Sequence, residues 1–431
     1  MTKVLFIAHY FPPLGGAGVQ RSAKFVKHLP ACGVLPLVLT GPGKEQSRWT
    51  PEDASLLADI PAGVPVQRAE YPANDPVARR AALLALGDRL IREHRPALIF
   101  VTMSPFGDAG IAAELARRHG LPWVADLRDP WALDEFQVYR TAWHRWRLRR
   151  RMGAALASAA SIILNTPEAR HQFRAAFPHL AGQARVAITN GYDAEEFPTT
   201  GTASRKERFT IVHSGYLHTT AGLHQRAHAW QYRLLGRLEP GVVILPRSHF
   251  YLLRALEEWL RREPASAARV RVELVGVPAP ADEQLVRESS AGRLCEFTGY
   301  LPHAECVRRV RAADLLFLPL HRLPPGRRSS IVPGKTYEYL ATRRPILAAV
   351  PEGDARDILA AAGTARLAAP DDEQGILTGL QAAFHDWEQG VDVSARWQPA
   401  AVERFERHNL TRQLAVELAA VLAAARPRPA V

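Results

Sequence analysis

The sequence predicts an α/β fold of two domains, each built on a parallel β-sheet. The first observation is size, because 431 residues with 47% hydrophobic content are natural for two cores and long for one. The second is an alternation of short apolar runs and longer amphipathic segments along the whole chain. The third is a polar stretch at 198–208 that separates two such series. Parallel sheets with helices on both faces explain all three observations.

The first series predicts the strands and helices of one domain. Strands are expected at Lys3–His9, Pro36–Thr40, Val64–Arg68, Ala97–Val101, Trp123–Leu127, Ser161–Leu164 and Arg185–Ile188. Helices are expected up to about Leu29, and at Val77–His94 and Gly107–His119.

The second series predicts another domain of the same kind. Its strands are expected at Phe209–His213, Val270–Val275, Leu294–Phe297, Leu315–Leu318, Ile346–Ala349 and Ala365–Ala368. The tail Ala400–Ala425 is predicted to be helical. The expected divisions are a first domain at 1–197, a linker at 198–208, a second domain at 209–395 and C-terminal helices at 396–431.

Composition narrows the class of protein. The net charge of +12 favours an anionic partner, although part of it reflects a general preference for Arg and Ala. No run reaches the ~18 apolar residues of a membrane span, and the N-terminus enters a strand without a signal-peptide pattern. Cys32, Cys295 and Cys306 are too few and too scattered for a disulfide framework or a zinc site. A cytoplasmic protein is therefore expected.

One segment, Ile331–Ala348, carries the clearest chemical pattern. It is predicted to be a loop punctuated by Pro333 and Gly334, then a short helix and a buried strand. Lys335 and Glu338 project from one face near the helix N-terminus, where free N–H groups favour an anion. A cation for phosphate and a carboxylate for ribose hydroxyls would lie side by side. The alternative is an ordinary helix start with one exposed ion pair.

A glycine-rich turn follows the first strand. Gly15, Gly16 and Gly18 lie between that strand and an amphipathic helix, a geometry that lets backbone approach a phosphate or a sugar. The third glycine of G-x-G-x-x-G is absent, and no Gly-Lys-Ser/Thr follows. The alternative is a tight turn without a ligand.

Together these motifs resemble the retaining GT-B glycosyltransferases of the family 4 type. Ile331–Ala348 is similar to their donor-binding segment (the glycosyl transferase group 1 signature), and the Pro-Pro-x-x-Gly-Gly turn is similar to their first loop. Thr189–Phe197 resembles the Pro-Asn-Gly-Val-Asp turn that ends their first domain, with Thr189 in place of proline. The resemblance implies two Rossmann-like domains facing across a cleft, with a C-terminal helix that crosses back to the first. It also implies a nucleotide-diphosphate sugar as donor, with no required cofactor or metal.

The resemblance assigns donor-side roles. Arg247 and Lys335 are expected to bind the diphosphate and stabilise the leaving charge. Glu338 matches the last Glu of the family's Glu-x7-Glu motif, but Ser330 stands where the first Glu is expected. Ser330, or backbone N–H groups near Ile331, are expected to replace the missing carboxylate at the sugar.

Two glycines and an insertion complete the expected donor side. Gly215 would let the nucleotide approach the backbone, and Gly276 would lie at the same edge. About 30 residues separate Val212–Leu217 from Arg247, so 218–246 is interpreted as an insertion with a helix near Leu223–Leu238. Insertions at the rim of a site are usually functional.

The acceptor side is expected at the end of strand Trp123–Leu127. There Asp126 or Asp129 would orient an acceptor hydroxyl, and Arg128 stands where many family members have His. The departing phosphate serves as the base in such enzymes, so no side-chain base is required. An Asp–Arg ion pair that caps the loop is the alternative.

Two further features concern partners. Tryptophans and arginines interleave in Trp143–Arg151, which suits an anionic membrane surface, although a solvated helix face explains the pattern as well. His224 and His228 have the spacing of a metal-binding pair, but a third ligand is not evident, so no metal is expected.

The leading hypothesis is a glycosyltransferase acting on a glycan, lipid-linked or natural-product acceptor, in the cytoplasm or peripherally on the inner face of the membrane. Polysaccharide biosynthesis is one setting that the resemblance makes plausible. The alternatives are a nucleotide-sugar epimerase of the same fold, a non-catalytic basic binding protein and a catalytically dead scaffold. Nucleic acid is not expected as a partner, because the basic residues outside 145–151 are scattered and no recognition motif appears.

Overall fold

The computed structural model describes residues 1–44, 52–72, 74–198 and 207–425. These residues form two compact units. Unit 1 contains Met1–Asp134, Trp146–Gly191 and Phe405–Val431, and unit 2 contains Glu135–Arg145 and Tyr192–Arg404. Most of the expected linker, 199–206, lies outside the described residues.

Unit 1 is a six-stranded parallel sheet in the order β3-β2-β1-β4-β5-β6. Its strands are β1 (Thr2–Ala8), β2 (Val34–Thr40), β3 (Val66–Arg68), β4 (Leu98–Met103), β5 (Trp123–Leu127) and β6 (Ser161–Leu164). Its helices are α1 (Ala17–His28), α2 (Pro76–His94), α3 (Asp108–His119), α4 (Ala142–Leu156, which begins in unit 2), α5 (Pro167–Ala176) and α16 (Arg407–Ala425).

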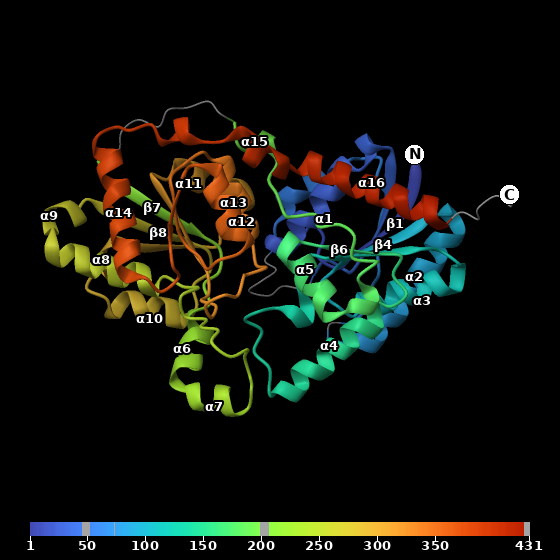
Figure 1. Cartoon of the computed structure of the whole chain (residues 1–431). Helices are drawn as coiled ribbons and strands as arrows, with labels where there is room; N and C mark the ends of the chain where they lie inside the picture. Colours follow the sequence, from blue (N-terminus) through green and yellow to red (C-terminus); the bar gives the residue numbers. More distant parts are fainter. Residues whose placement is uncertain (45–51, 73, 199–206, 426–431) are drawn as a thin grey trace. The chain divides into compact units, whose positions relative to one another are not determined.

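Helices cover both faces of this sheet because its strands are apolar on both sides. Ile7 and Val101 pack with Leu115 of α3 in one core cluster, while Phe6 and Phe100 pack in another. The second cluster includes Leu414 of α16, and Figure 1 shows α1 and α16 on the same side of the sheet. The C-terminal helix thus belongs to the first unit, as the resemblance implied.

Unit 2 repeats the plan with a six-stranded parallel sheet in the order β12-β11-β10-β7-β8-β9. Its strands are β7 (Phe209–Ser214), β8 (Val270–Val275), β9 (Cys295–Gly299), β10 (Leu315–Pro319), β11 (Ile346–Ala349) and β12 (Ala365–Ala368). Its helices are α6 (Thr219–Ala227), α7 (Ala229–Leu234), α8 (Phe250–Arg262), α9 (Pro264–Ala267), α10 (Pro280–Glu288), α11 (His303–Ala312), α12 (Gly334–Ala341), α13 (Asp354–Ala362), α14 (Glu373–Glu388) and α15 (Pro399–Val402).

Both sheets have the doubly wound strand order, which confirms the predicted α/β class. In each sheet the direction of winding reverses between the first and fourth strands, β1 and β4 in unit 1 and β7 and β10 in unit 2. Ligands of such sheets bind beyond the carboxyl ends of the strands at this switch point. The loops after β1 and β7 are therefore the places to look for a site.

The structure differs from the sequence-based expectation in three places. Arg185–Ile188 forms only an isolated bridge, between Ala187 and Leu164, rather than a seventh strand. The helix expected at Leu223–Leu238 is divided at His228 into α6 and α7. Residues 135–145 belong to unit 2 although unit 1 flanks them in sequence, and nothing in the sequence indicated this.

Candidate functional site

Lys335 lies in the first turn of α12, and its side chain reaches the end of β7. Its Nζ is 3.3 Å from Nε2 of His213. The other ring nitrogen, Nδ1, lies 2.9 Å from the carbonyl oxygen of Phe317. Because a carbonyl only accepts, Nδ1 carries the proton and Nε2 accepts from the ammonium. Lys335 is thus held over the switch point of unit 2.

The electrostatics around Lys335 favour an anion. Burial, followed by the nearby Arg247 guanidinium, lowers the pKa of Lys335 from 10.5 to about 7. Burial and Lys335 in turn hold the pKa of His213 well below its ordinary value. Among the described residues, no carboxylate lies within 4.0 Å of Lys335 Nζ, so the simple ion pair of the alternative interpretation does not form. A cation with depressed pKa beside a second cation is typical of a functional site.

Two glycines beside Lys335 leave the backbone there without side chains. Gly215 has a φ of +91°, and a Cβ atom there would lie 2.8 Å from Lys335 Nζ. Gly276, with a φ of +136°, follows β8 and faces the Gly215 carbonyl, which a Cβ would approach to 3.3 Å. Side chains at either position would occupy the space above the strand ends.

We expect Gly215→Ala to weaken nucleoside diphosphate binding by about tenfold or more, because the methyl group displaces the Lys335 ammonium. Gly326→Ala is the matched control, since Gly326 has a φ of +78° but nothing within 4 Å of a Cβ. Calorimetric titration of both variants checks this. Equal losses in the two variants would mean that backbone strain alone is responsible.

Arg247 approaches the same place from the end of the insertion. The His218 N–H donates to the Arg247 carbonyl oxygen at 2.9 Å, so the chain leaves for 218–246 and returns at one point. The Arg247 guanidinium lies 4.5 Å from the centre of the Phe136 ring. It lowers the pKa values of Lys335, His213 and His321, which places its charge among them.

A buried carboxylate organises the loop before α12. Glu135 accepts the Ser330 N–H (2.5 Å), the Ser330 hydroxyl (2.9 Å) and the Ser329 hydroxyl (2.7 Å). It also lies 2.9 Å from His321 Nε2, with both side chains fully buried. Burial lowers the pKa of His321. Burial alone would raise the pKa of Glu135, but the hydrogen bonds from His321, Ser330 and Ser329 outweigh it and lower that pKa. A neutral His321 therefore donates to a charged Glu135.

These contacts correct the expected role of Ser330 and Ile331. Both donors of Ser330 are bound to Glu135, and its side chain is fully buried. The Ile331 N–H donates to the Ser329 hydroxyl at 3.2 Å. Neither group is available to a sugar, so the loop is a support for Lys335 rather than a contact surface.

Several supporting residues carried no signal in the sequence. Glu135 is 186 residues from His321, and no local pattern links them. Tyr339 accepts the Ser214 N–H at 2.7 Å and anchors α12 to the end of β7. His213 could have been found, because it ends an expected strand at the edge where ligands bind.

The structure of unit 1 corrects the role expected for Asp126. Asp126 is fully buried, and its two oxygens accept from Arg21 Nε (2.8 Å) and Nη2 (2.6 Å). Thr102 Oγ1 donates to the same carboxylate at 2.8 Å. Arg21 also donates to the carbonyl oxygens of Ile188 and Thr189. Asp126 is therefore a structural ion-pair partner, of Arg21 and not of Arg128.

The glycine turn of unit 1 packs against Arg128. The Arg128 guanidinium donates to the Gly18 carbonyl and lies 4.8 Å from the centre of the Tyr10 ring. A Cβ on Gly18 would lie 2.6 Å from this guanidinium, and Gly16 takes a φ of +88° at the helix N-cap. Gly15 is buried in the turn. Asp129, 3.3 Å from Arg128 Nε, keeps 56% of its side chain exposed and is the accessible carboxylate of this motif.

A second ionic cluster in unit 1 had no sequence signal. His9 directly follows β1, and its Nδ1 is 3.4 Å from Arg79 Nη2. Arg79 Nη2 also lies 2.6 Å from Asp108 Oδ1 at the start of α3. Burial alone would lower the pKa of Arg79, but Asp108 raises it above the ordinary value. This cluster borders the carboxyl end of β1, where the turn begins.

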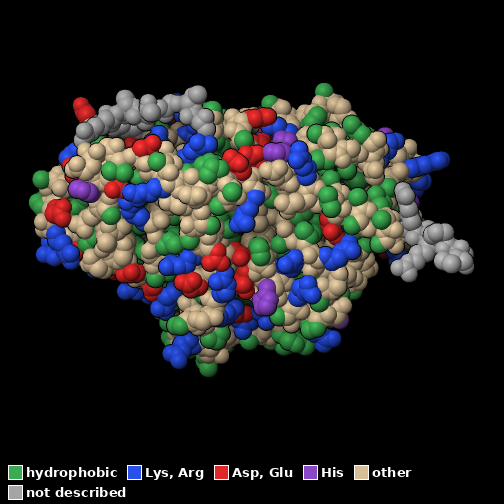
Figure 2. Space-filling view, turned by 45° about the horizontal axis from the view of Figure 1, so that its top comes forward, with side chains coloured by type: hydrophobic (Ala, Val, Ile, Leu, Met, Phe, Trp, Pro, Cys, Tyr) green, Lys and Arg blue, Asp and Glu red, His purple; other side chains and the backbone are tan. Residues whose placement is uncertain are grey.

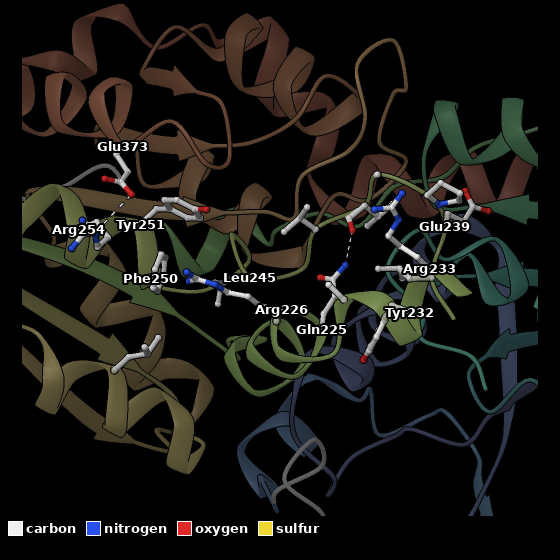
Figure 3. A pocket seen from close by; sticks show the side chains of 18 of the residues that line it. Gln225, Arg226, Tyr232, Arg233, Glu239, Leu245, Phe250, Tyr251, Arg254 and Glu373 are labelled. Atoms are coloured by element: carbon white, nitrogen blue, oxygen red, sulfur yellow. Dashed lines mark hydrogen bonds and ion pairs between the residues drawn. The ribbon is translucent and has the colours of Figure 1, made fainter. Parts of the chain in front are cut away.

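Unit 2 also holds a cavity of about 990 Å³, away from Lys335, between the insertion and α8. Figure 3 shows Gln225, Arg226, Tyr232 and Arg233 entering from α6 and α7. The helix α8 contributes Phe250, Tyr251, Leu253 and Arg254. Arg254 is paired with Glu257 and Glu373, whereas Arg226 lies 5.8 Å from the Phe250 ring centre.

The His224–His228 pair makes local contacts. The rings stack with centroids 4.3 Å apart, and His224 Nδ1 lies 3.0 Å from the Tyr232 hydroxyl. Within the described ranges, no three His, Cys, Asp or Glu side chains gather as a metal-binding group.

Comparisons with known proteins agree with this architecture. The sequence profile of a glycosyl transferase 4-like domain matches residues 15–191. The comparison with curated proteins found no significant match.

Solved structures of the same fold match nearly the whole chain. Sucrose-phosphate synthase from Thermosynechococcus elongatus has a TM-score of 0.66 at 14% identity, covering 98% of this chain and 100% of its own. Anabaena HepE in complex with UDP has a TM-score of 0.62 at 16% identity, covering 97% and 100%. A putative UDP-N-acetylglucosamine 2-epimerase from Listeria monocytogenes has a TM-score of 0.57 at 11% identity, covering 99% and 98%. These likenesses establish the GT-B fold, and with the profile match they support a glycosyltransferase.

Proposed function

We propose that the protein is a retaining glycosyltransferase that uses a nucleotide-diphosphate sugar. The observation that carries the proposal is the convergence of Lys335 and Arg247 beside two bare glycines at the switch point of unit 2. A diphosphate is the anion that two adjacent cations and a helix N-terminus suit best. The UDP complex of Anabaena HepE is in line with such a donor.

In this proposal, different residues of unit 2 bind different parts of the donor. Lys335 and Arg247 bind the diphosphate and stabilise the charge that builds on the leaving phosphate. The half-buried Glu338, one turn along α12, takes the ribose hydroxyls. Gly215 and Gly276 let the nucleotide lie against the strand ends. The leaving phosphate accepts the proton of the acceptor hydroxyl, and the new bond forms on the face from which the phosphate departs.

Unit 1 supplies the acceptor side in this proposal. Asp129 is exposed and orients the hydroxyl, while Arg128 fixes the glycine turn. The acceptor is a glycan, a lipid-linked sugar or a natural product, as in polysaccharide biosynthesis.

Donor binding is expected to take up about one proton at pH 8, because the diphosphate restores the charge of Lys335. The lowered pKa means that Lys335 of the free protein is largely neutral above pH 7, so affinity falls as the pH rises from 7 to 9. The free energy of unfolding changes in the opposite direction. Between pH 7 and pH 10.5 the unfolded chain keeps the Lys335 proton and the folded protein does not, so the cost of burying Lys335 falls and the folded state becomes more stable as the pH rises. Calorimetry in buffers of different ionisation heat measures the uptake, and Lys335→Met is expected to abolish it. Equal uptake by both proteins would contradict the assignment.

The epimerase alternative makes a different prediction. The product of an epimerase is a nucleotide sugar with one sugar carbon inverted. A retaining transferase instead moves the sugar to the acceptor with the same anomeric configuration and releases the nucleoside diphosphate. Proton NMR of UDP-, GDP-, ADP- and dTDP-sugars incubated with the protein distinguishes them. A C2-epimerised nucleotide sugar would overturn the transferase proposal.

Nucleic acid is not part of this proposal. Figure 2 shows Lys and Arg dispersed over one face with Asp and Glu between them. Many of the arginines are paired, for example Arg118 with Asp88 and Arg271 with Glu296. No helix in the described part of the chain is long and apolar enough to cross a membrane.

A further inference from the structure

The insertion exposes a group of large apolar side chains. Trp230, Leu234 and Leu235, in and just after α7, are 66%, 75% and 43% exposed, and Trp143 at the start of α4 is 54% exposed. Single exposed apolar residues are ordinary, but a contiguous group rimmed by polar residues marks an interaction surface. We call these four residues the tip patch.

Backbone hydrogen bonds hold the two parts of the tip patch together. The Ala142 N–H donates to the Leu235 carbonyl at 2.9 Å, and the Tyr139 N–H donates to the Arg237 carbonyl at 2.7 Å. A Cβ on Gly236 would lie 2.9 Å from that of Ala142. Both segments belong to unit 2, and Figure 1 shows α6 and α7 extending from one end of its sheet. Trp143 therefore lies beside the residues that follow α7.

Exposed arginines without a carboxylate partner among the described residues lie on the segments that carry or adjoin the tip patch. Arg140, Arg226 and Arg233 are exposed, and none has a carboxylate within 4.0 Å in the part of the chain that the structure describes. Arg254 and Arg327 nearby are instead neutralised, by Glu257 and Glu239. In Figure 3, Arg233 extends from α7, which also carries Trp230 and Leu234, and Arg226 extends from the adjoining α6. Their charges are left for an anion outside the protein.

We propose that the tip patch docks the protein on an anionic lipid bilayer. Trp and Leu enter the interface between head groups and acyl chains, and the arginines bind lipid phosphates while their stems cover apolar surface. The exposed arginines beside the patch favour an anionic bilayer over an uncharged apolar partner. From the sequence, a membrane contact at Trp143–Arg151 was one interpretation and a solvated helix face the other, and the exposed residues of α7 add to the first. This inference does not depend on the proposed reaction.

Sedimentation of the full chain with lipid vesicles tests the proposal. The vesicles are phosphatidylcholine alone or phosphatidylcholine mixed with phosphatidylglycerol, at low and high salt. The patch variant is Trp230→Ser/Leu234→Ser. The matched control is Val77→Ser/Val416→Ser, which removes two similarly exposed apolar side chains from α2 and α16. A charge variant, Arg226→Gln/Arg233→Gln, tests the head-group contacts.

The wild type is expected to bind the anionic vesicles at low salt and to be released at high salt. The patch variant should lose at least about tenfold in partitioning, the charge variant should bind neutral and anionic vesicles alike, and the control should match the wild type. Thermal stability of all variants checks that they are folded. Failure of the folded wild type to bind, or equal loss in patch variant and control, would overturn the proposal. A patch variant that changes only the oligomeric state in the absence of vesicles would also overturn it, in favour of a protein interface.

Discussion

Lys335→Met is expected to lower the release of nucleoside diphosphate from the donor sugar by about 10²–10³-fold, the usual effect of removing one charge-stabilising group. Methionine keeps the length of the side chain at the end of β7 but removes the positive charge that, with Arg247, stabilises the leaving phosphate in this proposal. Release from UDP-, GDP-, ADP- and dTDP-sugars, measured with and without acceptor extracts, provides the comparison.

Lys3→Met is the control for Lys335→Met, because Lys3 is exposed near the N-terminus of the chain. It should retain full activity and stability. The account would be wrong if Lys335→Met folded normally and retained wild-type turnover with the accepted donor.

Glu135→Ala is expected to lower the free energy of unfolding by about 3–5 kcal/mol, because it breaks a buried ion-pair network and leaves its partners unsatisfied. His321 and both donors of Ser330 would lose their acceptor inside unit 2. Ser330→Ala removes the hydroxyl that donates to Glu135 and should cost about 1–2 kcal/mol. Denaturant unfolding followed by circular dichroism measures both values.

Glu283→Ala serves as the control for this experiment, since Glu283 is half exposed and pairs with Arg287 one turn along α10. Its loss should stay within about 0.5 kcal/mol. A loss in Glu135→Ala no larger than in Glu283→Ala would show that the network does not stabilise the loop before α12. If the stability falls as expected, nucleotide binding should weaken with it, because the same loop positions Lys335.

The sequence predicted those features that depend on local pattern. Trp123–Leu127 and Val270–Val275 form strands with the expected bounds, because short segments rich in Val, Leu and Trp favour strands even with a few charged residues among them. Lys335 lies in the first turn of a short helix that follows a loop, as the sequence predicted. The glycines at 16, 215 and 276 have the positive φ angles that a close backbone approach requires.

Features that depend on distant partners could not be predicted. From the sequence, Asp126 was predicted to orient an acceptor hydroxyl. In the structure Arg21, 105 residues away in the chain, binds both of its oxygens. Ser330 was predicted to replace a missing carboxylate at the sugar. Its N–H and hydroxyl instead donate to Glu135, which is 195 residues away in the chain. Hydrophobic periodicity carries no information on such pairs, because any charged residue near a strand end fits the same pattern.

Titration of UDP, GDP, ADP and dTDP into the wild type and into Glu338→Ala tests the central claim most directly. The account predicts that one nucleotide binds the wild type in a one-to-one ratio and that Glu338→Ala loses most of this affinity, because α12 holds the ribose and the diphosphate together. A ligand at a hundredfold excess over its Kd should also stabilise the wild type by about 2.7 kcal/mol. The absence of binding by all four nucleotides, or equal binding by the variant, would contradict a nucleotide-sugar site at the switch point of unit 2.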